Sequence, residues 1–393
     1  MFSRWLSLPS ARSCLLVGPR RSGKTTYLKQ QFPELEYRTL DDLDFLDWAE
    51  KDPKGFVQDL GQSGIIDEIQ RHPRLTLAVK HAIDSQDAFL LMTGSSTLGL
   101  LDSAADTLAG RIIIQSLPPA CWGEELGPPT HSILQEKAHP LQIKKANRGL
   151  QQAMTFGQFP EVLTSEQEAD KKEVLTRYKN TYFTRDLMQL SNIENLQGLL
   201  SIFHNLVHSL GSHLEVSNFA REAGLSHPTA KKYLNALNQA QLTFQLSGYQ
   251  YGPAKKFIKA TKTYFADNGI ITSLNIPVGH GPLLESFVIA EMEKRRKLGF
   301  IPADRLYYYK SASGHEIDLL FQVDDMLYAI EIKSTQRPGM KDISNLRQFE
   351  PRQDIAVTRI LFYLGDEYTT WDGVQLVNSF YNLYGSSHCS ALA

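Results

Sequence analysis

Apolar runs alternate with short polar turns along the first third of the chain. Residues 13–17 predict a short buried strand, residues 18–25 a glycine-containing turn, and residues 26–31 a helix. Further strands are predicted by the apolar runs at 64–66, 88–92 and 112–114. A strand, a glycine turn and a helix in this order, followed by more strands, are typical of an α/β fold with a parallel sheet.

The pattern changes after residue 117, where proline, glycine and mixed polar residues continue to residue 141. A long helical stretch follows at 171–190, and residues 197–250 predict helix, helix, turn, helix and strand. The last part of the chain predicts a helix at 283–297 and strands at 305–310, 314–321 and 328–334. We therefore expect a helical middle region and a second α/β region.

A complete phosphate-binding motif occupies the first glycine turn. The pattern G-x-x-x-x-G-K-[ST] is matched by Gly18, Pro19, Arg20, Arg21, Ser22, Gly23, Lys24 and Thr25, and Thr26 follows it. Glycines let the backbone wrap closely around phosphate oxygens, and N–H groups at a helix start supply positive potential. We expect Lys24 to reach the β- and γ-phosphates of ATP and the Thr25 hydroxyl to hold Mg²⁺.

Two acids, Asp67 and Glu68, end the apolar run that begins at residue 64. Asp67 would assist the metal ion, and Glu68 would polarise the attacking water. Such a pair also occurs where a strand ends in a solvated turn. The complete motif upstream favours the catalytic interpretation of this pair.

Polar residues after the next strand offer two interpretations. The hydroxyls of Ser95 or Ser96 either sense the γ-phosphate or cap a helix. Arg111 would touch phosphate in its own subunit, reach a neighbouring subunit's site as an arginine finger, or form a surface salt bridge. A homo-oligomer is expected if Arg111 works in trans.

The middle region has helix-turn-helix spacing. Helices are predicted at 216–223 and 230–241 around a turn at 224–226, with a wing strand at 242–246. Between residues 223 and 266 there are six lysines and no acid, at 231, 232, 255, 256, 259 and 262. This excess fits contact with a DNA backbone, although such units inside ATPases often only pack against other domains. His204 and His208 lack a third ligand and are interpreted as ordinary helix residues.

Four residues near the C-terminus suggest a second site. Strand alternation sends Glu331 and Lys333 to one face, and Asp318 on the neighbouring strand could meet Glu331 across the pair. These groups can bind Mg²⁺ or Mn²⁺ and activate water for phosphodiester attack, with Glu285 completing the metal shell. Lys333 would orient or deprotonate that water, or offset charge on the phosphate. Alternating charges on an exposed strand are the other interpretation.

Composition sets limits on these hypotheses. The chain has 393 residues, too many for one ordinary core, and a net charge of -2, which excludes a uniformly basic nucleic-acid coat. No stretch approaches the roughly 20 apolar residues that cross a bilayer. Three cysteines without a C-x-x-C pair fit a reducing cytosol and no structural zinc. We expect a cytoplasmic protein without membrane contact.

The chain resembles prokaryotic AAA-type ATPases whose C-terminal domain of unknown function has a restriction-endonuclease-like fold. Four segments carry this resemblance, at 18–26, 65–70, 91–96 and 108–111. The resemblance runs from about residue 10 to about residue 370. It implies that residues 18–25 are the Walker A loop, Asp67 and Glu68 the Walker B pair, and Arg111 the arginine position. The group Asp318, Glu331 and Lys333, with Glu285 upstream, resembles the PD-(D/E)XK nuclease pattern.

The resemblance and the patterns together predict four regions: a P-loop ATPase core at 1–128, a helical connector at 129–195, a winged-helix-like region at 196–255 and a nuclease-like α/β domain at 256–393. The first hypothesis is an ATP-hydrolysing enzyme that acts on nucleic acid, with DNA favoured over RNA but RNA left open. The alternative is an ATP-controlled binding or switch protein whose last domain is a non-catalytic platform for DNA or a protein partner. A small-molecule kinase fits poorly, because no acceptor-substrate motif accompanies the loop.

Overall fold

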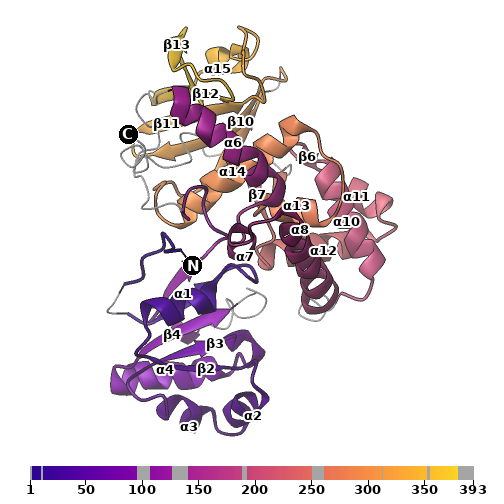
Figure 1. The fold of residues 1–393 in the computed structure, drawn as a ribbon. Coiled ribbons are helices and arrows are strands. Elements are labelled where there is room, and N and C mark those ends of the chain that lie inside the picture. Colours follow the sequence, from indigo (N-terminus) through magenta and orange to yellow (C-terminus); the bar gives the residue numbers. More distant parts are fainter. Residues whose placement is uncertain are drawn as a thin grey trace.

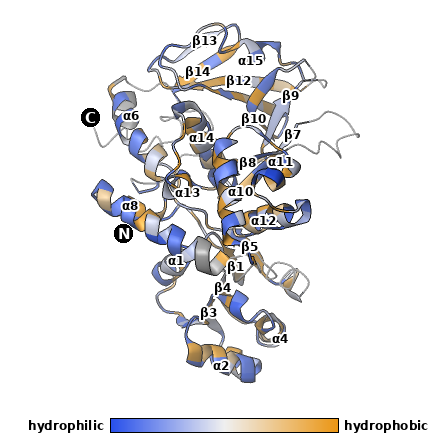
Figure 2. Cartoon of the chain, turned by 90° about the vertical axis from the view of Figure 1, so that its right-hand side faces the viewer, coloured by the Kyte–Doolittle hydropathy of each residue, from blue (hydrophilic) through white to orange (hydrophobic). Residues whose placement is uncertain are grey.

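The computed structural model describes residues 2–9, 12–94, 107–125, 140–187, 193–249, 261–311, 313–351 and 355–378. The predicted α/β class is confirmed: a parallel sheet forms the N-terminal part of a mixed α/β chain. Figures 1 and 2 show the two sheets at opposite ends of the molecule, with helices of the middle region between them. Within the described residues, no helix is long and apolar enough to cross a membrane.

The N-terminal sheet has five strands in the order β2-β3-β4-β1-β5, and every pair is parallel. Its strands are β1 (Cys14–Val17), β2 (Glu36–Thr39), β3 (Ser63–Asp67), β4 (Phe89–Gly94) and β5 (Ile113–Ser116). Its helices are α1 (Lys24–Gln31), α2 (Leu43–Lys51), α3 (Pro53–Gln58), η1 (Ile69–Arg71) and α4 (Leu75–Gln86). Because the strands are parallel, the loops after β1, β3 and β4 leave the sheet at one edge.

Both faces of this sheet are buried, which explains why its central strands are apolar without alternation. Leu15 and Ile66 belong to a core cluster on one face, whereas Leu16 and Ile65 belong to another on the opposite face. The predicted apolar runs therefore correspond to β1, β3, β4 and β5 with shifts of one or two residues at their ends.

Helices form the middle of the chain and share one apolar core. They are α6 (Pro140–Phe156), α7 (Pro160–Leu163), α8 (Glu168–Tyr178), the π-helical η2 (Lys179–Asp186), α10 (Leu196–His208), α11 (Val216–Glu222), α12 (His227–Gln239) and α13 (Asn268–Ser273). A turn with Gly224 at φ 63° joins α11 to α12. The Ser226 hydroxyl accepts a hydrogen bond from the Thr229 amide, as expected of a helix cap.

A nine-stranded sheet in the order β13-β14-β12-β11-β10-β9-β7-β8-β6 forms the other end. Its strands are β6 (His213–Leu214), β7 (Thr243–Gly248), β8 (Thr261–Phe265), β9 (Tyr307–Lys310), β10 (Glu316–Val323), β11 (Met326–Ile332), β12 (Ala356–Tyr363), β13 (Thr369–Trp371) and β14 (Val374–Asn378). Helices α14 (His280–Lys297) and α15 (Ser344–Gln348) contact this sheet. The predicted wing strand, β7, pairs with β8 and with β9, so the sheet continues across the predicted boundary after residue 255.

Candidate functional site

The loop after β1 requires its two glycines. A Cβ on Gly18 would lie 2.2 Å from the carbonyl oxygen of Leu117, so only glycine fits between the loop and the strand beside it. Gly23 has φ 91° and stands at the N-cap of α1, where a left-handed backbone favours glycine. Arg21 also has a positive φ, of 63°. The chain therefore turns sharply between β1 and α1 and directs the first amides of α1 toward the sheet edge.

Lys24 is buried at the start of α1. Its Nζ donates hydrogen bonds to the carbonyl oxygens of Gly18 and Pro19, at 3.0 and 3.1 Å. Burial lowers the pKa of Lys24 to about 8, although the charges of Glu68 and Asp67 oppose this shift. The Lys24 ammonium is thus held inside the loop. Phosphate oxygens of a bound nucleotide would have to contact it there.

Asp67 ends β3 and is surrounded by hydroxyl groups. The Thr25 hydroxyl lies 3.0 Å from both of its carboxylate oxygens, and the Tyr37 hydroxyl donates to Oδ2 at 2.6 Å. The hydroxyl of Thr93, at the end of β4, donates to Oδ1 and accepts from the amide of Glu68. The sequence motifs did not indicate Tyr37, nor the contact of Thr93 with Asp67, because these contacts depend on which strands are neighbours.

Glu68 takes a left-handed conformation, with φ 59°, directly after Asp67. This backbone turn separates the two carboxylates, so that Asp67 is buried while Glu68 is partly exposed. The side-chain amide of Gln70 donates to the Glu68 carboxylate. The two acids therefore have different surroundings, as their different predicted roles require.

The C-terminal group forms at the β10–β11 hairpin. Glu331 is buried, and its carboxylate contacts the Lys333 ammonium at 2.7 Å and the side-chain amide of Asn345 at 3.2 Å. Asp318, on the neighbouring strand, accepts a hydrogen bond from the amide of Ile332 at 2.8 Å. Asp318, Glu331 and Lys333 are thus brought together at the end of β11.

Glu285, on α14, lies close enough to the same group for the charges of Asp318 and Lys333 to act on it. The Tyr264 hydroxyl donates to its Oε1 at 2.6 Å, and the Lys262 ammonium lies 3.9 Å from that oxygen. Lys262 also forms an ion pair with Glu316 at 2.5 Å. Neither Tyr264 nor Lys262 was indicated by the sequence as part of this site, since their strand, β8, is distant from β10 in sequence and in strand order.

Two of these carboxyls hold protons more tightly than usual. Burial raises the pKa of Glu331 to about 8, and the nearby charge of Asp318 adds to the shift. The pKa of Glu285 is raised to about 7 for the same two reasons, with Lys262 opposing. Glu285 and Glu331 therefore have pKa values near neutral pH, a property that is common at functional sites.

Comparison with family models assigns three segments of the chain. Residues 10–126, which contain the loop, Lys24 and Asp67, match the model of an AAA domain. The N-terminal part is therefore an AAA domain. Residues 147–278 and 280–382 match two domains of unknown function, DUF8612 and DUF4143 respectively. The AAA domain and the C-terminal domain of unknown function agree with the predicted family resemblance, and the AAA domain indicates an ATPase.

Similar curated proteins come from bacteria and archaea and are described only as uncharacterized. A protein of Mycobacterium tuberculosis is 25% identical over 348 residues, which cover 85% of this chain and 73% of the relative. A protein of Methanocaldococcus jannaschii is 26% identical over 333 residues, covering 78% of this chain and 71% of the relative.

Solved structures match only weakly. A signal transduction ATPase with numerous domains and a tetratricopeptide repeat sensor, from Pyrococcus horikoshii, gives a TM-score of 0.24 at 10% identity, covering 74% of this chain and 46% of that chain. A Vibrio cholerae protein gives a TM-score of 0.23 at 12% identity, covering 96% and 97%. At such scores neither structure defines the fold of this chain.

The other predicted residues of the AAA domain lie in different places, and Arg111 precedes β5, at the edge of the sheet opposite the loop. Arg21 pairs with Glu161 of α7 at 3.0 Å, and Thr26 is exposed on α1. Arg111 forms an exposed ion pair with Asp84 at 2.6 Å. The two predicted sensor serines, at 95 and 96, lie outside the described residues.

Oxygen donors suited to Mg²⁺ are present in the AAA domain, since Thr25 and Asp67 supply a hydroxyl and a carboxylate in contact with each other. At the C-terminal group the donor types also suit Mg²⁺, but the arrangement does not. Among the described residues, no group of three or more His, Cys, Asp or Glu is placed to hold a metal ion. Lys333 and Asn345 instead occupy the oxygens of Glu331.

The predicted basic surface is only partly present. Lys231 and Lys232 are exposed on α12, whereas lysines 255, 256 and 259 lie outside the described residues. The expectation that Lys262 belongs to an exposed basic surface is wrong, because its side chain is 2% exposed and pairs with Glu316. A buried ammonium needs such acidic partners, and the hairpin of β10 supplies them.

Proposed function

We propose that the AAA domain binds ATP together with Mg²⁺ and hydrolyses the γ-phosphate. The contact of Thr25 with Asp67 beside the buried Lys24 is the observation that supports this proposal. The Lys24 ammonium would exchange the two loop carbonyls for phosphate oxygens, and the loop amides would hold the remaining phosphates. Thr25 and Asp67 would hold Mg²⁺, which neutralises phosphate charge when bound. Glu68 would orient and polarise the attacking water.

Three variants test these roles. Lys24→Ala should abolish ATP binding, as measured by titration calorimetry. Glu68→Gln should still bind ATP but lose phosphate release, because the amide cannot accept a proton from water. Asp84→Asn, an exposed acid on α4, is the matched control and should hydrolyse ATP at the wild-type rate. ATP binding by Lys24→Ala at wild-type affinity would contradict the proposal.

We further propose that ATP turnover controls a nucleic-acid-processing site at the C-terminal group, where Asp318, Glu331 and Glu285 support metal-dependent cleavage of a phosphodiester. Glu285 and Glu331 each lie close enough to Asp318 and Lys333 for those charges to act on their pKa values, and this proximity supports the role. Because Lys333 and Asn345 occupy the oxygens of Glu331, metal binding would require these contacts to open first. Nucleotide-dependent movement of the domains is a means of opening them.

A cleavage assay tests the second site. Wild-type protein is incubated with plasmid, single-stranded DNA and RNA, in Mg²⁺ or Mn²⁺, with and without ATP. Glu331→Ala should abolish cleavage, whereas Asp325→Ala, in the turn of the same hairpin, should not. Cleavage that depends on both ATP and Glu331 would support a coupled nuclease.

The alternative is an ATP-controlled binding protein whose C-terminal domain is a platform for DNA or a protein partner. Lys262 and Lys333 favour it, because they already neutralise the acids that a metal ion would need. Thermal unfolding with added Mn²⁺ separates the two functions. Stabilisation that disappears in Asp318→Ala supports the nuclease, whereas intact ATPase activity without cleavage or metal-dependent stabilisation supports the platform.

A further inference from the structure

Arg4 connects the N-terminal segment to the phosphate-binding loop. Its guanidinium donates to the carbonyl oxygen of Ser22 at 2.6 Å and to that of Pro118 at 2.8 Å, and its Nε donates to Glu124 at 2.8 Å. All three guanidinium nitrogens of Arg4 thus donate hydrogen bonds, and the side chain is 5% exposed. A planar guanidinium with three fixed acceptors holds them at set distances from one another.

Glu124 holds Arg4 in turn. Its carboxylate is fully buried and also accepts hydrogen bonds from the amides of Trp5 and Cys121, at 2.5 and 2.7 Å. Oε1 of Glu124 therefore holds the N-terminal segment, and Oε2 fixes the carboxylate within residues 118–124, the segment that follows β5. The Ser22 carbonyl belongs to the loop, so this pair sets the position of the loop relative to segment 118–124.

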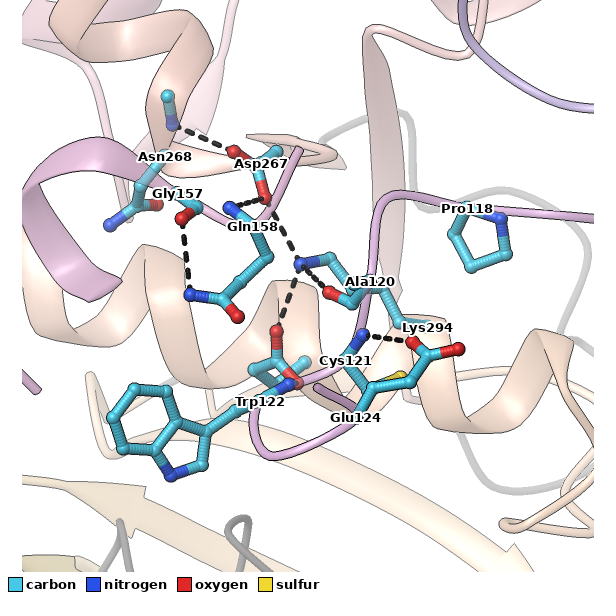
Figure 3. A network of polar contacts seen from close by, with 12 residues as sticks. Pro118, Ala120, Cys121, Trp122, Glu124, Gly157, Gln158, Asp267, Asn268 and Lys294 are labelled. Atoms are coloured by element: carbon cyan, nitrogen blue, oxygen red, sulfur yellow. Dashed lines mark hydrogen bonds and ion pairs between the residues drawn. The ribbon is translucent and has the colours of Figure 1, made fainter. Parts of the chain in front are cut away.

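Segment 118–124 is attached to α14 of the C-terminal domain by a buried charge network (Figure 3). The Lys294 ammonium contacts the Ala120 carbonyl at 3.0 Å, Glu291 at 2.8 Å and Asp267 at 3.1 Å. Glu291 also accepts from the amide of Trp122 at 2.8 Å. Burial alone would lower the pKa of Lys294, but Glu291 and Asp267 outweigh it and raise the pKa, so the Lys294 ammonium stays protonated.

The N-terminal segment contacts α14 directly as well. The guanidinium of Arg295 lies 5.2 Å from the ring of Trp5, which in turn packs edge-on against Phe300 at 5.8 Å. Two routes, through Glu124 and through Trp5, therefore join Arg4 to the same helix. A displacement of α14 would change the acceptor positions on which Arg4 depends.

We propose that Arg4 is a positioning residue for the nucleotide site, and that its hold on the loop carbonyl of Ser22 depends on the attachment of segment 118–124 to α14. Nucleotide occupancy and the position of the C-terminal domain are then coupled through Arg4 and Glu124. This proposal rests on the proposed binding of ATP at the loop, and it adds no group that touches the nucleotide.

The test measures ATP affinity by calorimetry, and kcat and KM by phosphate release, in full-length variants. Arg4→Gln should raise the Kd and KM for ATP about ten-fold, with a smaller change in kcat, because a charge-assisted contact that orders the loop is lost. Arg4→Lys keeps the charge and should restore part of the affinity. Arg347→Gln, which breaks an exposed ion pair with Asp372, is the matched control and should leave Kd unchanged.

A double-mutant cycle tests the dependence on α14. Glu291→Gln lies outside the loop and should also raise the Kd for ATP, and its effect should not add to that of Arg4→Gln. Additive effects, or a wild-type Kd in Arg4→Gln, would overturn the proposal. Loss of binding in Lys24→Ala alongside a wild-type Kd in Arg4→Gln would overturn this proposal while leaving the proposed ATP site intact.

Hydrogen exchange of the wild-type protein tests the coupling without any variant, so it does not depend on whether a variant folds. Addition of ATP should slow exchange at the amides of Cys121 and Trp122 as well as at the loop, because the contacts are continuous. Slower exchange in the loop alone, with unchanged exchange in segment 118–124, would overturn the coupling.

Discussion

The Thr25 hydroxyl lies 3.0 Å from the carboxylate of Asp67, although 42 positions separate the two residues in the chain. Thr25 follows β1 and Asp67 ends β3, and β4 lies between these strands in the sheet. Because all three strands are parallel, their carboxyl ends share an edge, and the Thr93 hydroxyl from β4 completes the contact. The topology therefore assembles the candidate Mg²⁺ ligands.

The lowered pKa of Lys24 predicts how ATP affinity changes with pH. Only the protonated ammonium attracts phosphate, and its pKa in the free protein is about 8. The Kd for ATP should therefore be constant below that pH and rise by up to about ten-fold per pH unit above it. Calorimetric titrations across this range test the prediction. Lys24→Arg, whose charge persists, should show a flatter profile, and equal slopes for both proteins would contradict the assignment.

Gly157 should be intolerant of a side chain. Its φ is +72°, and a Cβ would meet an Asp267 carboxylate oxygen at 1.7 Å, which disturbs the partner of Lys294. Gly157→Ala should lower the free energy of unfolding by about 3 kcal/mol. Gly224→Ala, with a similar φ of +63° and open space around it, should cost about 1 kcal/mol. Urea unfolding of the two variants tests this difference, and equal losses would show that backbone strain alone matters.

The raised pKa of Glu331 predicts a pH-dependent stability. In the folded protein the Glu331 carboxyl stays protonated up to about pH 8, whereas the ordinary pKa of a glutamate is 4.5. Protonation of Glu331 therefore stabilises the folded state at low pH. This stabilisation is lost as the pH rises from the ordinary pKa of glutamate through the pKa of Glu331 in the folded protein. Glu331→Gln should therefore gain melting temperature relative to wild type between about pH 5 and about pH 9. Asp325→Asn should show no such trend. A difference in melting temperature between Glu331→Gln and wild type that stays constant with pH would refute the raised pKa of Glu331.

Arg111 offers a test of action in trans. If it reaches a neighbouring subunit's nucleotide, Arg111→Ala should bind ATP normally and lose hydrolysis by about a thousand-fold. Asp84→Ala breaks the same exposed ion pair but keeps the arginine, and it should remain active. Light scattering should detect assembly of wild-type protein on ATP. A monomer with full activity would contradict action in trans.

Local patterns predicted much of the AAA domain. The run at 13–17 corresponds to β1, and Asp67 ends β3 as its apolar run indicated, because both depend on neighbours in the sequence. The cap at Ser226 was likewise predictable from the residues that follow it. The α/β class follows from such elements in order.

Contacts between distant segments were not predictable in this way. Arg4 and Glu124 are 120 positions apart, and nothing in either segment indicates the other. The lysines at 223–266 appear as a basic cluster in the sequence, yet Lys262 turns inward because β8 pairs with β7 and brings it to Glu285 and Glu316. The nine-stranded sheet arises from the same long-range pairing.

The decisive measurement of ATP hydrolysis at this loop is phosphate release from Mg²⁺-ATP by wild-type protein and by Lys24→Ala. We expect sustained turnover for the wild type and background release for the variant, with both proteins folded in the absence of nucleotide. Equal rates of phosphate release from the two proteins would contradict the assignment of ATP hydrolysis to this loop.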